Sequence, residues 1–145
     1  MQEAYREYFD FMERLGGTLD QLTKLAERKA DAVRRGDLSA VDSCMKQEQA
    51  LSLSLRTMDR KREKLLADMG LKDTNLSGLV QNCPTELKAD AKAAADRLRG
   101  RYELYRGAAD AARTLLEVNL HKLDKMLADE VDTPMHGSSV TDFRA

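Results

Sequence analysis

The sequence contains no tryptophan, only two prolines and only two cysteines, and aromatic side chains make up 5% of its 145 residues. The shortage of prolines removes a strong helix breaker, and the shortage of aromatics leaves little bulk for a broad core. Hydrophobic residues nevertheless make up 42% of the chain and charged residues 34%. This combination is typical of long helices that share a narrow apolar seam.

Signals for membranes, secretion and nucleic acids are also missing. No apolar run approaches the roughly 18–20 residues that span a bilayer, and the N-terminal segment "MQEAYREYFD" is too polar and acidic for a signal peptide. The formal net charge of −1 creates no strong field toward nucleic acid or a membrane surface. Cys44 and Cys83 lack metal-ligand or redox spacing, which fits a reducing compartment. We therefore expect a cytoplasmic protein that neither inserts into membranes nor binds nucleic acid.

The residue patterns that accompany catalysis or cofactor binding are absent as well. His121 and His136 are the only histidines, and neither has a second ligand at metal-binding spacing. No glycine-rich loop follows a predicted strand, and no serine or cysteine lies in a nucleophile motif. The basic stretch at 56–64 lacks interleaved aromatics, so it is interpreted as the solvated face of a helix. We expect a protein without enzymatic activity, metal or cofactor.

Apolar residues recur every three or four positions from Tyr5 to Val33, which predicts a helix with a heptad stripe. Gly16 and Gly17 interrupt this stretch, and each costs about 1 kcal/mol relative to alanine in a helix interior. The "TLDQ" segment at 18–21 could instead start a new helix as a capping box. Because the heptad phase continues across the glycines, one helix is favoured over two.

A short break follows in "RRGDLSAVDSCMKQEQAL" at 34–51. Gly36 can adopt the left-handed conformation that often ends a helix, and Asp37 can cap the next one. So short a link predicts an antiparallel helical hairpin. Glu48 and Arg62 fall on or beside the apolar stripe of the second helix, which Gly70 ends. Their charged heads could reach solvent at the edge of the seam, or form an ionic contact that fixes the register of the helices.

After a short turn of helix within 71–84, residues 85–130 form the longest predicted helix, roughly 65–70 Å at 1.5 Å per residue, against roughly 50 Å for each hairpin arm. The fold class is therefore all-α: an antiparallel helical hairpin plus a long third helix, in an elongated three-helix coiled-coil-like bundle. We expect residues 1–131 to form the helical domain. Residues 132–145 have no apolar period and are predicted to be a flexible C-terminal tail.

The third helix has an apolar arc too wide for a single seam. The two hairpin arms could cover this arc entirely, but the helix is longer than the arms, so part of it could lack a partner within the chain. Exposed apolar surface of this kind commonly marks an interaction site. We therefore predict partner binding by residues in the C-terminal half of this helix, with further anchors in the tail: Leu115, Val118, Leu120, Leu127, Met135 and Phe143.

Three segments stand out in the predicted helices: Gly-Asp-Leu at 36–38, Lys-x-Glu-Gln at 46–49, and Arg-x-x-Leu-Leu followed by Gly-Leu at 62–71. Together they resemble the FlgN-type flagellar export chaperones. The resemblance covers nearly the whole chain. One departure is Ala112, since family members often carry asparagine three residues before the Leu-Leu pair of the last helix.

The resemblance implies a non-enzymatic cytoplasmic chaperone of flagellar type III secretion. Such proteins bind hook-associated proteins, which form the hook–filament junction, cover a C-terminal amphipathic segment of this cargo, and dock it at the export gate. The alternative is a coiled-coil adaptor or scaffold whose apolar stripes serve self-association. The identity of the cargo and the oligomeric state stay open at this point.

Overall fold

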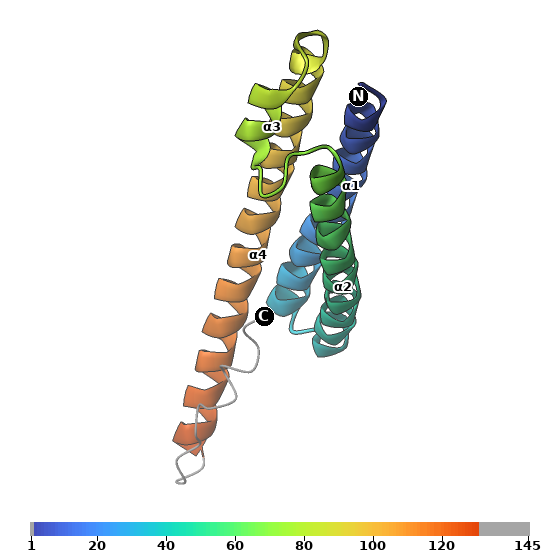
Figure 1. The fold of residues 1–145 in the computed structure, drawn as a ribbon. Helices are drawn as coiled ribbons and strands as arrows, with labels where there is room; N and C mark the ends of the chain where they lie inside the picture. Colours follow the sequence, from blue (N-terminus) through green and yellow to red (C-terminus); the bar gives the residue numbers. More distant parts are fainter. Residues whose placement is uncertain (1, 131–145) are drawn as a thin grey trace.

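The computed structural model describes residues 2–130, and every regular element in this range is helical. The elements are α1 (Gln2–Arg35), α2 (Leu38–Asp68), α3 (Leu76–Asn82), the 3₁₀ turn η1 (Thr85–Leu87) and α4 (Lys88–Glu130). Helices α1 and α2 form an antiparallel hairpin, and α4 runs beside α1 in the same direction and extends beyond the closed end of the hairpin (Figure 1). The predicted all-α fold with two hairpin arms and a longer third helix is confirmed.

The turn at Gly36 closes the hairpin as predicted. Gly36 has a φ of +69°, a conformation that side chains disfavour, and its amide donates to the carbonyl of Val33 at 3.1 Å. The next amide, of Asp37, donates to the carbonyl of Ala32 at 2.9 Å. The Asp37 carboxylate then accepts the amide of Ala40 at 3.0 Å and so caps α2. One glycine and one aspartate thus reverse the direction of the chain.

The segment between α2 and α4 covers the open end of the hairpin, opposite the turn at Gly36. Helix α2 ends at Asp68, and Gly70 has a φ of +75°. The side chain of Asn75 accepts the amide of Gly78 at 2.7 Å and caps α3. Pro84 then precedes η1, from which α4 continues without a break.

Helix α1 lies at the centre of the packing, because both α2 and α4 pack along it. The largest buried cluster surrounds the N-terminal half of α1 and includes residues from α2, α3, η1 and α4: Tyr5, Tyr8, Phe11, Met12, Leu66, Met69, Leu79, Cys83, Leu87, Ala91, Ala94 and Ala95. A smaller cluster at the closed end of the hairpin joins α4 to both arms: Ala32, Val33, Val41 and Leu116. Between these two clusters, α2 and α4 make no comparable contact with each other.

Glu48 resolves one of the alternatives left open by the sequence. Its carboxylate lies 2.8 Å from Nζ of Lys29, and the two side chains are only 19% and 13% exposed. Lys29 lies on α1 and Glu48 on α2, so the pair joins the two hairpin arms through a largely shielded ionic contact. Arg62, in contrast, is only partly buried and pairs with Asp59 of its own helix at 3.1 Å. The ionic alternative therefore holds for Glu48.

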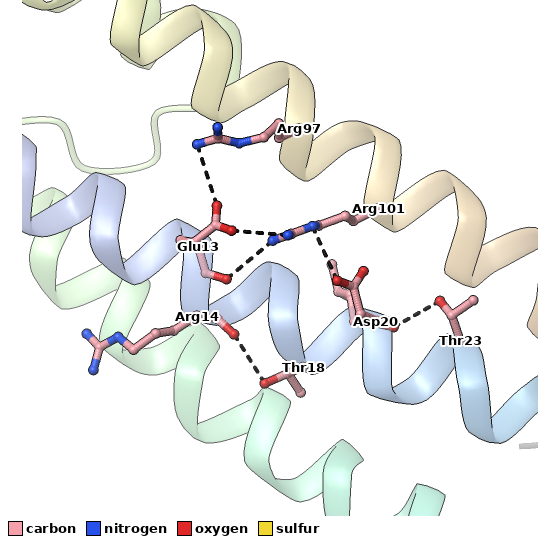
Figure 2. A network of polar contacts seen from close by, with 8 residues as sticks. Glu13, Arg14, Thr18, Asp20, Thr23, Arg97 and Arg101 are labelled. Atoms are coloured by element: carbon pink, nitrogen blue, oxygen red, sulfur yellow. Dashed lines mark hydrogen bonds and ion pairs between the residues drawn. The ribbon is translucent and has the colours of Figure 1, made fainter.

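Helix α1 is continuous through Gly16 and Gly17, as the heptad phase predicts, and the structure explains why Gly16 is tolerated. Arg101 of α4 lies across α1 at this point (Figure 2). Its guanidinium pairs with Glu13 at 3.1 Å and with Asp20 at 3.4 Å. A Cβ atom at Gly16 would lie 2.8 Å from Cδ of Arg101 and closer still to Nη1. The glycine thus provides the space in which this arginine reaches both carboxylates.

The conformation of Gly36 generates a first prediction. We expect Gly36→Val to lower the free energy of unfolding by about 1 kcal/mol or more, because a β-branched residue tolerates a positive φ poorly. Gly36→Asn is the matched control and should be milder, since asparagine adopts the left-handed conformation more readily. Urea unfolding followed by circular dichroism measures both. Equal stability of the valine and asparagine variants would contradict the role assigned to this turn.

The contact between Gly16 and Arg101 generates a second prediction. In an Arg101→Ala background, Gly16→Ala should stabilise the protein by about 1 kcal/mol through helix propensity. With Arg101 present the gain should be smaller, because the arginine must leave ion pairs of about 0.2–1 kcal/mol each. Gly17→Ala is the control, since a Cβ there meets nothing within 4 Å, and its effect should be the same in both backgrounds. The same change in stability from Gly16→Ala in both backgrounds would contradict the role assigned to Gly16 in making room for Arg101.

Candidate functional site

The C-terminal half of α4 lies at the closed end of the hairpin and beyond it. Leu116 is buried there against Val33 of α1 and Val41 of α2. Helix α4 has 43 residues, whereas α1 has 34 and α2 has 31, and its last turns extend past the hairpin (Figure 1). These last turns therefore have no neighbouring helix among the residues that the structure describes.

The structure divides the predicted partner-binding residues of α4 into two groups. Leu115 and Leu120 are half-buried and pack against the cluster around Leu116. Val118 is 45% exposed. Leu127 is half-buried and belongs to no buried cluster of residues 2–130. Hairpin contacts thus occupy part of the predicted surface and leave the rest open.

Two further apolar residues belong to this open surface, and neither was among the predicted partner-binding residues. Leu123 is 50% exposed and Met126 is 60% exposed. Both continue the heptad stripe of α4, but the stripe runs on after the hairpin has ended. The predicted helix lengths could have indicated this exposure, because the shorter hairpin arms cannot cover apolar positions that lie beyond their ends. The predicted tail residues Met135 and Phe143 lie outside the described residues.

A second open apolar surface was not foreseen from the sequence. It is a groove between α2 and α4, with α1 as its floor and α3 closing one end, and it has a volume of about 810 Å³. We call it the α2–α4 groove. Its apolar lining comes from all four helices: Tyr8, Leu15, Leu19, Leu55, Leu66, Leu76, Leu79, Leu98 and Tyr102.

Burial raises the pKa of several tyrosine and cysteine side chains in the described range. Burial raises the pKa of Tyr8, and the neighbouring Arg62 acts in the opposite direction. Burial also raises the pKa of Tyr105, to which the Glu48 carboxylate adds. Cys83 is buried, which raises the pKa of its thiol and disfavours the reactive thiolate. Within residues 2–130 no group of three His, Cys, Asp or Glu side chains could hold a metal ion.

None of the helices within the described range is long and apolar enough to cross a membrane. The fold is an all-α bundle of long helices that leaves apolar surface open on α4 and between α2 and α4. The profile of the FlgN protein family matches residues 1–128. The chain belongs to this family, which is a family of chaperones of flagellum biogenesis. Comparisons with curated proteins and with solved structures find no match.

The overhang of α4 generates a third prediction. We expect the backbone amides of residues 121–130 to exchange with solvent at least about tenfold faster than those of residues 108–116, because only the latter pack against the hairpin. Hydrogen exchange corrected for intrinsic rates compares the two segments within one helix, so the helix serves as its own control. Equal protection of the two segments would show that another surface covers the overhang.

Proposed function

We propose that this chain is a cytoplasmic export chaperone that binds hook-associated proteins of the hook–filament junction and delivers them to the flagellar export gate. Membership of the FlgN family supports the chaperone role. The observation that carries the binding role is the exposure of Val118, Leu123 and Met126 on the open part of α4. Apolar surface exposed in this way commonly marks an interaction site.

The proposed cargo segment is an amphipathic helix. Its apolar face would associate with other copies before export, so a chaperone must cover that face. A helix supplies a matching stripe, because anchors at every third or fourth position contact a partner helix along its length. In this proposal Leu123 and Met126 form the middle of the stripe. Leu115 and Val118 flank it on one side and Leu120 and Leu127 on the other, with Leu115 and Leu120 also held by the hairpin. Met135 and Phe143 are proposed as further contacts with the cargo.

This role requires no chemical step. It requires only that the chain bind a cargo segment and release it. Release at the export gate requires that the contact be reversible. A stripe one helix wide meets this need, because only the side chains on one face are buried by the partner. The chaperone can therefore shield a segment of cargo without enclosing it.

The alternative is a coiled-coil adaptor or scaffold whose open stripe binds a second copy of the chain. The same exposure of Val118, Leu123 and Met126 favours it. The two functions differ in the state of the isolated protein. A chaperone should be an elongated monomer that becomes more protected when cargo is added, whereas a scaffold should form stable higher oligomers. Sedimentation equilibrium with and without cargo distinguishes them.

The fourth prediction concerns the open stripe of α4. We expect a Val118→Asp, Met126→Asp variant to keep its helicity and melting temperature, because both side chains are exposed. Its affinity for hook-associated proteins should fall at least about tenfold, since a charge replaces an apolar anchor at two places. A Thr114→Asp, Ala128→Asp variant is the control, because it adds the same charge at two other exposed positions of α4.

Titration calorimetry with purified hook-associated proteins measures these affinities. Unchanged binding by the Val118→Asp, Met126→Asp variant would place the cargo elsewhere, and unfolding would show that these residues support the fold. Deletion of residues 132–145 forms a further arm. We expect it to weaken cargo binding and leave melting unchanged, because Met135 and Phe143 are proposed as contacts and not as core.

A further inference from the structure

The α2–α4 groove lies where one more helix would complete a four-helix bundle. Its walls are α2 and α4, its floor is α1, and its lining is mostly leucine and tyrosine. Three helices that leave one side open resemble a four-helix bundle from which one member has been removed. A helix laid between α2 and α4 would cover Leu55, Leu98 and Tyr102 at once.

The length of the groove sets the length of its occupant. On α2 the lining extends from Leu55 to Leu66, which is roughly 16 Å at 1.5 Å per residue. This corresponds to about three helical turns. Within residues 2–130 no helix fills the space, and α3, the one short helix, already closes its end through Leu76 and Leu79.

The charges around the groove indicate the polar side of its occupant. Arg56, Arg60, Arg62 and Arg99 line it, against two carboxylates, Asp59 and Glu63. Arg62 pairs with Asp59 at 3.1 Å, and Arg99 pairs with Asp96 at 3.4 Å.

Arg56 and Arg60 differ from these two arginines. They are four residues apart, so they lie on the same face of α2, at the edge of the groove. Both are exposed, and neither has an ion-pair partner among the described residues. Two unpaired arginines in a row favour carboxylates on the partner.

We propose that the α2–α4 groove is a docking site for an amphipathic helix of about three turns with an acidic polar face, provided by the export cargo. The proposal rests on the proposed function for the source of this helix. It adds a second contact surface, separate from the stripe of Val118, Leu123 and Met126. Leucine-type anchors would enter between Leu55 and Leu98, and carboxylates would meet Arg56 and Arg60.

Two labelled peptides test the chemistry of the groove directly. Both carry the same leucine face over three to four turns, and their polar faces are all glutamate in one and all lysine in the other. Fluorescence anisotropy should show that the unaltered protein binds the glutamate peptide at least about tenfold more tightly than the lysine peptide. Equal affinities, or binding of neither peptide, would overturn the proposal.

Charge reversal at the edge of the groove then locates the contact. Arg56→Glu with Arg60→Glu should reverse the preference between the two peptides. Arg34→Glu with Arg106→Glu changes the charge by the same amount at exposed positions outside the groove. This control should shift both affinities by less than about twofold, since distant surface charges are screened by salt. Equal changes in peptide affinity in the two double variants would contradict the placement of the contact at Arg56 and Arg60.

A third variant tests the apolar lining. Leu55→Asp with Tyr102→Asp should abolish binding of both peptides while helicity is kept. If it unfolds, the arginine variants still decide the question, because their side chains are exposed. A dimer of the unaltered protein that this variant dissociates would show a second copy in the groove, contrary to the proposal.

An assay of hook-associated protein binding distinguishes a failure of the groove proposal from a failure of the proposed function. Loss of cargo affinity in Arg56→Glu with Arg60→Glu, but not in Arg34→Glu with Arg106→Glu, supports both. If the unaltered protein binds no cargo, the proposed function fails and the peptide result judges the groove alone. If cargo binds the unaltered protein and the groove variant equally, the groove inference fails and the function stands.

Discussion

The close packing of α4 on α1 is the contact on which the rest of the structure depends. The residues that α4 buries are mainly small, with Ala91, Ala95 and Ala112 fully covered. On α1, Ala26 and Ala30 meet the same seam. Alanines allow two helices to approach closely, so α4 lies near α1 along this seam. The larger α4 side chains Leu98 and Tyr102 lie beside the seam and line the α2–α4 groove.

Arg101 and Gly16 fix this contact at one place along the two helices. A heptad seam of alanines is nearly uniform, so it specifies the register of α4 on α1 weakly. The arginine reaches Glu13 and Asp20 only where a glycine leaves room for it. Each exposed ion pair contributes little to stability. A specific position is the larger consequence, because a shift by one turn would direct Arg101 onto a side chain instead of Gly16.

Sequence reasoning predicted the features that depend on local chemistry. The turn at Gly36 and the continuous α1 follow from backbone preferences and heptad phase, and both are confirmed. The exposure of Leu123 and Met126 was missed, because the stripe looks the same whether or not a neighbour is present. The α2–α4 groove depends on how the helices are placed around α1. No periodicity within a single helix contains that information.

The outer residues of the open apolar surfaces are not among those that hold the fold together. Tyr8 and Leu66 border the groove and belong to the core, but Leu55 and Tyr102 are partly exposed at its mouth. Val118, Leu123 and Met126 lie on α4 away from the buried clusters. Such residues can change with little loss of stability, so binding strength can vary independently of folding.

The shape of these surfaces also limits what they can bind. Each is a strip about one helix wide with charged residues beside it, such as Lys122 and Lys125 along the overhang and Arg56 and Arg60 along the groove. Narrow strips of this kind keep the exposed apolar area small, which limits non-specific association. They also match the single face of an amphipathic helix better than the broad surface of a folded domain. A chaperone built in this way would select helical segments of its cargo by the pattern of their side chains, with apolar anchors on one face and complementary charge on the other.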